Sequence, residues 1–367
     1  MRGFWVVNVE GVNPIDIMQD TKIVMLYHSI QNMMSQTGTV LEYIRLARLH
    51  SSALSGLTLL FGALAISTDL DPWLAAGLFL VGILVHIFGF VLNEYFDLEV
   101  DRRLDLLAGK PLVSGAVKPG SALVFCAAAA VLSYLIFTFL IGSGEFWWPR
   151  IFLILSIAVF YSYDRWGKRW AVADALLAGY VGFLCLAGSA ATGWPLNPLA
   201  VVVAVLAFGQ LFLQNALANM KDVIQDADAG AKTTALRLGV RVDKKNNRFI
   251  IPGPFKGYIL VVKLIHVAVI YGYLLFFSAF DLFQFVFVTL VVIVMMAVLY
   301  RILWMRYFER ERLLRAIGGH ELITYAIIPL LFIGLINPMT VILLIIFPVV
   351  WMAAFMQMMY GRLLPNI

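Results

Sequence analysis

Apolar residues gather along the chain into ten stretches that are separated by shorter polar connections. A helix rises 1.5 Å per residue, so about 20 apolar residues cross the roughly 30 Å hydrocarbon layer of a bilayer. The ninth stretch is short and contains Pro329, so we expect it to be a tilted or broken span. The pattern predicts an all-α membrane bundle of nine to ten transmembrane helices around a central cavity, from spans near residues 50–67, 73–95, 118–141, 148–164, 171–191, 198–218, 257–280, 282–304, 321–336 and 338–360.

Composition and the placement of positive charge support a multi-pass membrane protein and give its orientation. Hydrophobic residues make up 62% of the chain and charged residues 13%, with a mean hydropathy of +0.90, which excludes an ordinary soluble globule. Of the 27 Lys and Arg residues, 25 lie before the first span, in alternate connections or at Arg362. By the positive-inside rule, these segments face the cytoplasm of the cell membrane. The exceptions are Arg150 and Lys263, and Lys263 is expected to snorkel to the cytoplasmic surface.

The remaining composition adds little chemistry. The net charge of +5 is explained by cytoplasmic loops beside membrane lipid and calls for no nucleic-acid partner. Cys126 and Cys185 have no pairing or metal spacing and are expected to be small buried hydrophobic residues. No linker divides the chain, so we predict a cytoplasmic or interfacial segment over residues 1–44 and one membrane domain over 45–367.

Two acidic stripes at helical spacing mark the candidate site. Asn93, Asp97 and Asp101 leave the second span at steps of four residues, each of which turns a helix by only about 40° net. The second stripe follows the sixth span at i, i+4, i+7 and i+11, as Asn215, Asn219, Asp222 and Asp226. Oxygen ligands of this kind suit Mg²⁺, which usually bridges to phosphates. Four crossings separate the stripes, which favours two four-helix pseudo-repeats.

Other polar residues surround the stripes in the sequence. His86 shares the face of Asn93 deeper in the second span, whereas Glu94 is expected to point elsewhere. Tyr161 and Asp164 stand at the membrane end of the fourth span and are expected to bond toward the stripes. Positive charge that would stabilise a diphosphate leaving group comes from five residues near these motifs: Arg103, Lys110, Lys168, Arg169 and Lys221.

Four motifs in order resemble the UbiA superfamily of intramembrane prenyltransferases. They are NExxDxxxD after the second span, GKPLVSG, a KR connection after the fourth span, and KDxxxDxDxGxKTTALRLG after the sixth, and the similarity runs over about residues 45–305. The chain departs from the usual pattern in having Glu94 for Asp and Lys110 for Arg, which keeps the charge and loses bidentate geometry. The insert 240–256 and a tenth span lie outside the common plan.

The resemblance implies transfer of a polyprenyl group from an isoprenyl diphosphate donor to a lipophilic or aromatic acceptor in the membrane. Magnesium would be held by Asn93, Asp97, Asp101, Asp222 and Asp226, of which the four aspartates are the predicted catalytic residues. Lys168 and Arg169 are expected to close over the diphosphate. The predicted substrate-binding residues are His86, Asn93, Arg103, Lys110, Tyr161, Lys168, Arg169, Asn215, Asn219 and Lys221.

Two alternatives stay open at this point. A terpene cyclase on the same scaffold would ionise the donor without an acceptor. A secondary transporter would also carry inward-facing acids, but its site is expected near the bilayer midplane, whereas these acids lie at the cytoplasmic ends of their spans. The sequence does not identify the acceptor, and our weak preference is for an archaeal-type lipid or quinone product.

Overall fold

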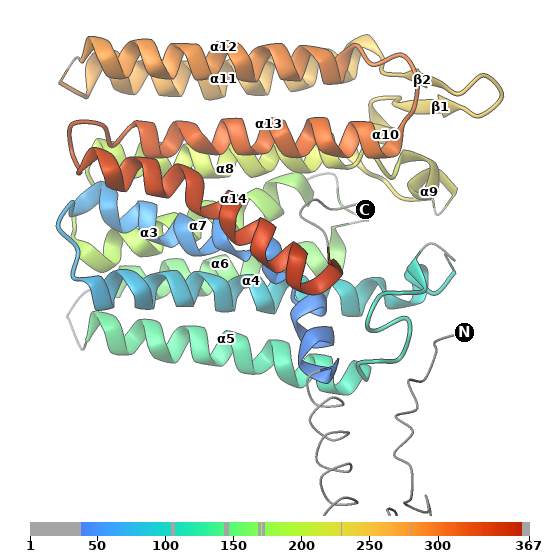
Figure 1. The fold of residues 1–367 in the computed structure, drawn as a ribbon, viewed down its shortest axis with the longest axis horizontal. Coiled ribbons are helices and arrows are strands. Elements are labelled where there is room, and N and C mark those ends of the chain that lie inside the picture. Colours follow the sequence, from blue (N-terminus) through green and yellow to red (C-terminus); the bar gives the residue numbers. More distant parts are fainter. Residues whose placement is uncertain are drawn as a thin grey trace, which may run out of the picture.

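The computed structural model describes residues 38–103, 107–142, 147–167, 170, 173–228, 230–279 and 281–361. Ten long helices occupy the positions of the ten predicted spans (Figure 1). Most of the predicted 1–44 segment lies outside the described residues, and residues 38–46 are helical. The long helices are α3 (Ser52–Ile66), α4 (Pro72–Asp101), α5 (Pro119–Ile141), α6 (Trp148–Trp166), α7 (Ala173–Thr192), α8 (Pro198–Ala218), α11 (Gly253–Phe276), α12 (Leu282–Leu303), α13 (Arg310–Leu330) and α14 (Pro338–Tyr360).

Short elements connect the long helices on the side of the acidic stripes. A single 3-10 turn, η1 (Leu49–Ser51), precedes α3, and the short helices α9 (Val223–Asp228) and α10 (Thr234–Arg237) follow α8. The insert that the sequence sets apart forms an antiparallel hairpin of β1 (Arg241–Asp243) and β2 (Arg248–Ile250). The hairpin is hydrogen-bonded to the connection after α12, where Phe249 N donates to the carbonyl of Arg306 at 2.8 Å.

Several helices start where the sequence supplies both a cap and a proline. Asp71 accepts from the backbone of Trp73, Asn197 from Ala200 and Asn337 from Met339, and a proline follows each of these caps directly. A proline costs nothing in the first turn, where its missing N–H would have no partner inside the helix. These local signals explain why the predicted starts of α4, α8 and α14 agree with the structure to within a residue.

Eight of the ten long helices have the length and apolarity needed to cross a membrane, and α6 and α13 are more polar. The count of nine to ten crossings and the two pseudo-repeats therefore remain predictions. The ninth span differs from its expected form. It begins at Arg310, well before residue 321, and Pro329 lies in its last turn instead of breaking it. Pro329 cannot donate a backbone hydrogen bond to the preceding turn, and the helix ends one residue after it, at Leu330.

The helices pack in layers, with α11 and α12 lying over α8 and α13, and α14 crossing the bundle obliquely beside α3 (Figure 1). The backbones of α3 and α7 approach each other closely. A Cβ atom on Gly62 would lie 1.9 Å from the carbonyl oxygen of Cys185, and one on Gly188 would lie 1.9 Å from that of Leu59. Small residues permit this approach of two backbones. Cys126 and Cys185 are buried free thiols, as expected.

Gly188→Ala should destabilise the bundle, because the new methyl group can be accommodated only if the α3 or α7 backbone moves. Overpacking of this kind costs roughly 1 to 3 kcal/mol. Gly257→Ala is the matched control, since nothing lies within 4 Å of a Cβ atom there in α11. Thermal denaturation in detergent should give a lower midpoint for Gly188→Ala than for Gly257→Ala. Equal midpoints would contradict the close packing of α3 on α7.

Lys263 is a second point where the structure departs from expectation. Its side chain is 0% exposed, and Nζ donates to Thr324 Oγ1 of α13 at 3.1 Å. Lys263 follows Ile259 by four residues on the buried stripe of α11. It therefore points into the α11–α13 interface and does not snorkel.

Candidate active site

The first acidic stripe is positioned by the length of α4. This helix has 30 residues, or about 45 Å, which is longer than the hydrocarbon layer is thick. Its final turns carry Asn93, Asp97 and Asp101 and continue past the predicted end of the span at residue 95. The structure keeps all three residues in one uninterrupted helix, so the stripe has the single face that its spacing predicts.

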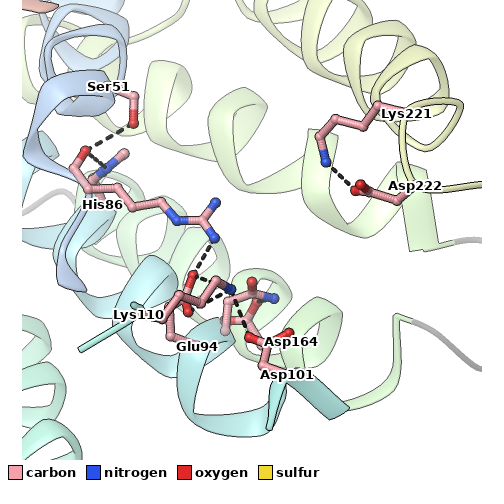
Figure 2. Close-up of polar contacts among 10 residues, drawn as sticks. Ser51, His86, Glu94, Asp101, Lys110, Asp164, Lys221 and Asp222 are labelled. Carbon is pink, nitrogen blue, oxygen red and sulfur yellow. Dashed lines mark hydrogen bonds and ion pairs between the residues drawn. The ribbon is translucent and has the colours of Figure 1, made fainter. Parts of the chain in front are cut away.

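Glu94 and Asp101 of this helix belong to one ion-pair network. Lys110 Nζ lies 2.7 Å from Asp101 Oδ2 and 2.9 Å from Glu94 Oε2, so one ammonium group joins two carboxylates (Figure 2). Arg48 contacts Glu94 from the other side. Glu94 is 5% exposed. The expectation that Glu94 points away from the site is therefore wrong, because i and i+7 also share a helix face and Glu94 and Asp101 meet at Lys110.

Arg48 enters the network through an unusual backbone conformation. It adopts the left-handed region, with φ of 48°, and its carbonyl accepts from Ser51 Oγ at 3.0 Å. Its guanidinium lies 5.5 Å from the centre of the Phe90 ring. Burial lowers the pKa of the Arg48 guanidinium. The carboxylate of Glu94, above all, raises this pKa, and the net shift is upward. A pairing with a residue 46 positions away leaves no periodic signal, and sequence reasoning missed it.

The second stripe is less regular than its spacing predicts. Helix α8 ends at Ala218, and Asn219 is its C-terminal cap. Asp222 lies in the turn before α9, and the N–H of Asp226 donates to the Asp222 carbonyl at 2.8 Å. Asp222 and Asp226 are thus one helical turn apart, but they do not continue the face of Asn215 in a single helix.

Asp222 is held between two cations. Lys221 contacts Oδ2, and Arg310 Nη2 of α13 lies 3.1 Å from Oδ1. Burial raises the pKa of the Asp222 carboxyl, but Lys221 and Arg310 together lower it below the ordinary value. Figure 2 shows Lys221 and Asp222 apart from the Glu94–Lys110–Asp101 group. The sequence offered no sign of Arg310, since its role depends on the packing of α13 against α8.

Two consecutive residues of α6 connect the stripes. Asn93 Nδ2 donates to Asp164 Oδ1 at 3.3 Å, and the hydroxyl of Tyr163 donates to Asn215 Oδ1 at 3.4 Å. Asn215 Nδ2 also donates to Asp174 Oδ1 of α7 at 2.5 Å. The expected role of Asp164 is confirmed. The tyrosine that reaches a stripe is Tyr163 and not Tyr161.

Several predicted residues lie away from these contacts. Tyr161 is 42% exposed and packs edge-on to Phe96. His86 is 1% exposed, and its ring nitrogens lie 3.2 Å from Ser55 Oγ and 3.3 Å from the Arg48 carbonyl oxygen. His86 therefore belongs to the packing of α4 on α3, and its predicted substrate contact is not supported. Arg103 is exposed at the end of α4, and Asn219 is partly buried. Lys168 and Arg169 lie outside the described residues.

The acids have the chemistry that Mg²⁺ requires. Within the described ranges, no three acidic, His or Cys side chains form a ready cage for a metal ion. Magnesium is usually bound through one or two carboxylates together with substrate phosphates and water. Without a metal ion, Lys110 neutralises Asp101. Lys221 and Arg310 neutralise Asp222 in the same way. The two stripes thus fit metal sites that a diphosphate would complete.

Comparison with known proteins gives a consistent set of relatives. The sequence profile of the UbiA prenyltransferase family matches residues 55–321. Digeranylgeranylglyceryl phosphate synthase of Hyperthermus butylicus is 27% identical over 54% of this chain and 68% of its own length. 4-Hydroxybenzoate octaprenyltransferase of Pseudoalteromonas atlantica is 30% identical over 49% and 62%. Protoheme IX farnesyltransferase of a Caulobacter species is 30% identical over 45% and 48%. The chain thus spans about half to two thirds of these curated relatives.

Solved structures share the fold. A UbiA homologue from Archaeoglobus fulgidus bound to GPP and Mg²⁺ superposes with a TM-score of 0.58 at 17% identity, over 78% of this chain and 99% of the other. A structure described with digeranylgeranylglyceryl phosphate synthase in membranes gives a TM-score of 0.59 at 19% identity, over 81% and 98%. At these identities the likeness concerns the arrangement of helices.

Proposed function

The chain belongs to the UbiA prenyltransferase family, and from this premise we propose that it transfers a prenyl group from an isoprenyl diphosphate to a lipophilic or aromatic acceptor. The observation that carries the proposal is the pair of cation-bound acidic groups, one at Asp101 and one at Asp222. The allylic C–O bond breaks and its electron pair leaves with the diphosphate. An acceptor carbon or oxygen then supplies the pair for the new bond and loses a proton.

In this proposal the cations exchange partners when the donor binds. Lys110 is held by both Glu94 and Asp101, so it can release Asp101 and turn to the diphosphate while Glu94 retains it. At the second stripe Lys221 and Arg310 share one carboxylate, Asp222, so either cation can turn to the diphosphate while the other stays on Asp222. Magnesium bound by Asn93, Asp97, Asp101, Asp222 and Asp226 would neutralise the diphosphate and favour its departure. Charge-assisted bonds from these cations would hold the leaving group.

An aromatic column packs α4, α6 and α7 together inside the bundle. Phe160 stacks on Tyr180 with 4.2 Å between centroids, and Phe90 meets Phe160 edge-on at 6.0 Å. A Cβ atom on Gly89 would lie 2.0 Å from the Phe160 ring, so the glycine makes room for it. The Phe160 and Tyr180 rings are 2% and 4% exposed, so this column holds the three helices together.

Incubation of the purified protein with GPP, MgCl₂ and a panel of phenolic and glycerol-lipid acceptors tests the proposal. Mass spectrometry should detect an acceptor whose mass has increased by one prenyl group, and release of diphosphate should depend on magnesium. A cyclic hydrocarbon formed without any acceptor would favour the terpene cyclase. Uptake of a solute into proteoliposomes with no turnover of GPP would favour the transporter.

The proposed site faces the cytoplasm, in agreement with the sorting of basic residues. Thr68 lies in the connection between α3 and α4, and Lys245 lies in the β-hairpin connection on the stripe side; both are exposed. In intact cells, an impermeant thiol reagent should label Thr68→Cys. Lys245→Cys should react only after permeabilisation. The reverse pattern would place the acids on the outer face and contradict the proposed orientation.

A further inference from the structure

A carboxylate of α13 points into the bundle, apart from both acidic stripes. Glu321 lies one helical turn before Tyr325, so the two side chains share a face. Tyr325 packs against Phe61 of α3, with 5.6 Å between ring centroids, and its hydroxyl donates to the Leu344 carbonyl. The face that carries Glu321 is therefore turned toward α3 and the middle of the bundle.

Two glutamines of α8 hold Glu321 in place. Gln214 Nε2 donates to Glu321 Oε2 at 2.9 Å, and Gln210 Nε2 donates to the Glu321 backbone carbonyl at 3.4 Å. Gln214 directly precedes Asn215, where the second acidic stripe begins. A rise of about 1.5 Å per residue puts the Gln214–Glu321 pair at the depth of the inner end of that stripe.

This pair offers a hydrogen-bond acceptor that lacks a donor. Gln214 Oε1 is buried and has no partner in the part of the chain that the structure describes. Glu321 is partly exposed, and no Lys, Arg or His among the described residues forms an ion pair with it. Lys263 is taken up by Thr324 on the α11 side of α13. A carboxylate inside a membrane bundle without a counter-ion marks a substrate or ion pathway.

We propose that Gln214 and Glu321 line the acceptor pocket and select an acceptor that presents a hydroxyl group, and no carboxylate, to this end. The inference rests on the proposed transfer function and deepens it. Carboxylate and amide oxygens both accept a hydroxyl proton. When Glu321 is ionised, a carboxylate on the acceptor would instead meet a like charge in a medium of low dielectric constant, where repulsion is strong.

Binding of two matched probes tests the selection. 4-Hydroxybenzoate and its methyl ester differ at the carboxylate, and both are titrated at pH 8, where Glu321 is ionised, into protein that holds magnesium and a non-hydrolysable thiolo analogue of GPP. The wild-type protein should bind the ester at least about tenfold more tightly, since like charges repel. Glu321→Gln is nearly isosteric and should reduce the preference to about threefold or less, as the repulsion is removed.

Two controls keep the result specific. Glu321→Asp retains the charge and should keep the preference for the ester. Glu99→Gln changes a glutamate whose side chain is 77% exposed and should also keep it. Equal binding of the two probes by the wild-type protein, an undiminished preference in Glu321→Gln, or binding of neither probe would overturn the inference. Titration of the GPP analogue alone is the separate readout for the proposed function, because its failure to bind would refute donor recognition and not merely acceptor selection.

Discussion

Asp97→Ala, Asp101→Ala, Asp222→Ala and Asp226→Ala should each reduce prenyl transfer by about a hundredfold or more, the scale on which loss of one electrostatic stabiliser lowers an enzymatic rate. Each change removes an oxygen ligand that the proposed metal site requires. Rates are measured as diphosphate release with saturating GPP and acceptor.

These variants should remain folded in detergent, with the largest loss of stability in Asp101→Ala, because Asp101 is buried and paired with Lys110. Asp222 is a third exposed and Asp97 is partly exposed, so neither is part of the packed core. Asp243→Asn is the control, because that carboxylate lies in the β-hairpin and contacts only its own turn, at Lys245 and Asn246. Wild-type rates in any two of the four alanine variants would refute the assignment of the stripes.

Glu94→Gln should lower both stability and activity, although the sequence alone predicts a mild effect. Glu94 is the buried carboxylate that Arg48 and Lys110 share, and neutralising it leaves two cations without their main partner. Breaking a buried pair by removing one member costs about 3 kcal/mol or more. Because Arg48 and Lys110 retain some exposure, we expect the lower end of that range. The apparent midpoint of thermal unfolding in detergent measures the change.

Activity should fall with stability, because Lys110 would then be held by Asp101 alone. A lysine bound only to Asp101 competes with the metal for that carboxylate, so Glu94→Gln should raise the magnesium concentration needed for half-maximal rate. Glu99→Gln, one turn further along α4 and exposed, should change neither property. A Glu94→Gln variant with the stability and magnesium dependence of the wild-type protein would show that the Arg48–Glu94–Lys110 network has no role.

The sequence was sufficient where a feature depends on neighbours along the chain. Helix positions followed from apolar length, and their starts followed from caps and prolines such as Asp71 with Pro72. The first stripe was also predictable, because Asn93, Asp97 and Asp101 stay within one helix. The second stripe was mistaken for one continuous face because the end of α8 at Ala218 has no glycine or proline to announce it.

Features that depend on packing between distant helices could not be predicted. Glu94 was misjudged because one helical wheel does not show that Arg48 and Lys110 approach from two other segments. Tyr163 and Tyr161 are two residues apart on α6, and only the position of α8 decides that Tyr163 meets Asn215. The burial of Lys263 could not be predicted either, because its partner Thr324 on α13 is far away in the sequence.

We propose that the two acidic groups bind a prenyl diphosphate through magnesium. The most direct measurement is the equilibrium affinity of the purified protein for the thiolo analogue of GPP, once with MgCl₂ and once with EDTA. We predict tight binding with magnesium, and binding weaker by at least about tenfold without it, since the carboxylates would then repel the diphosphate. Equal affinity under the two conditions would contradict the account.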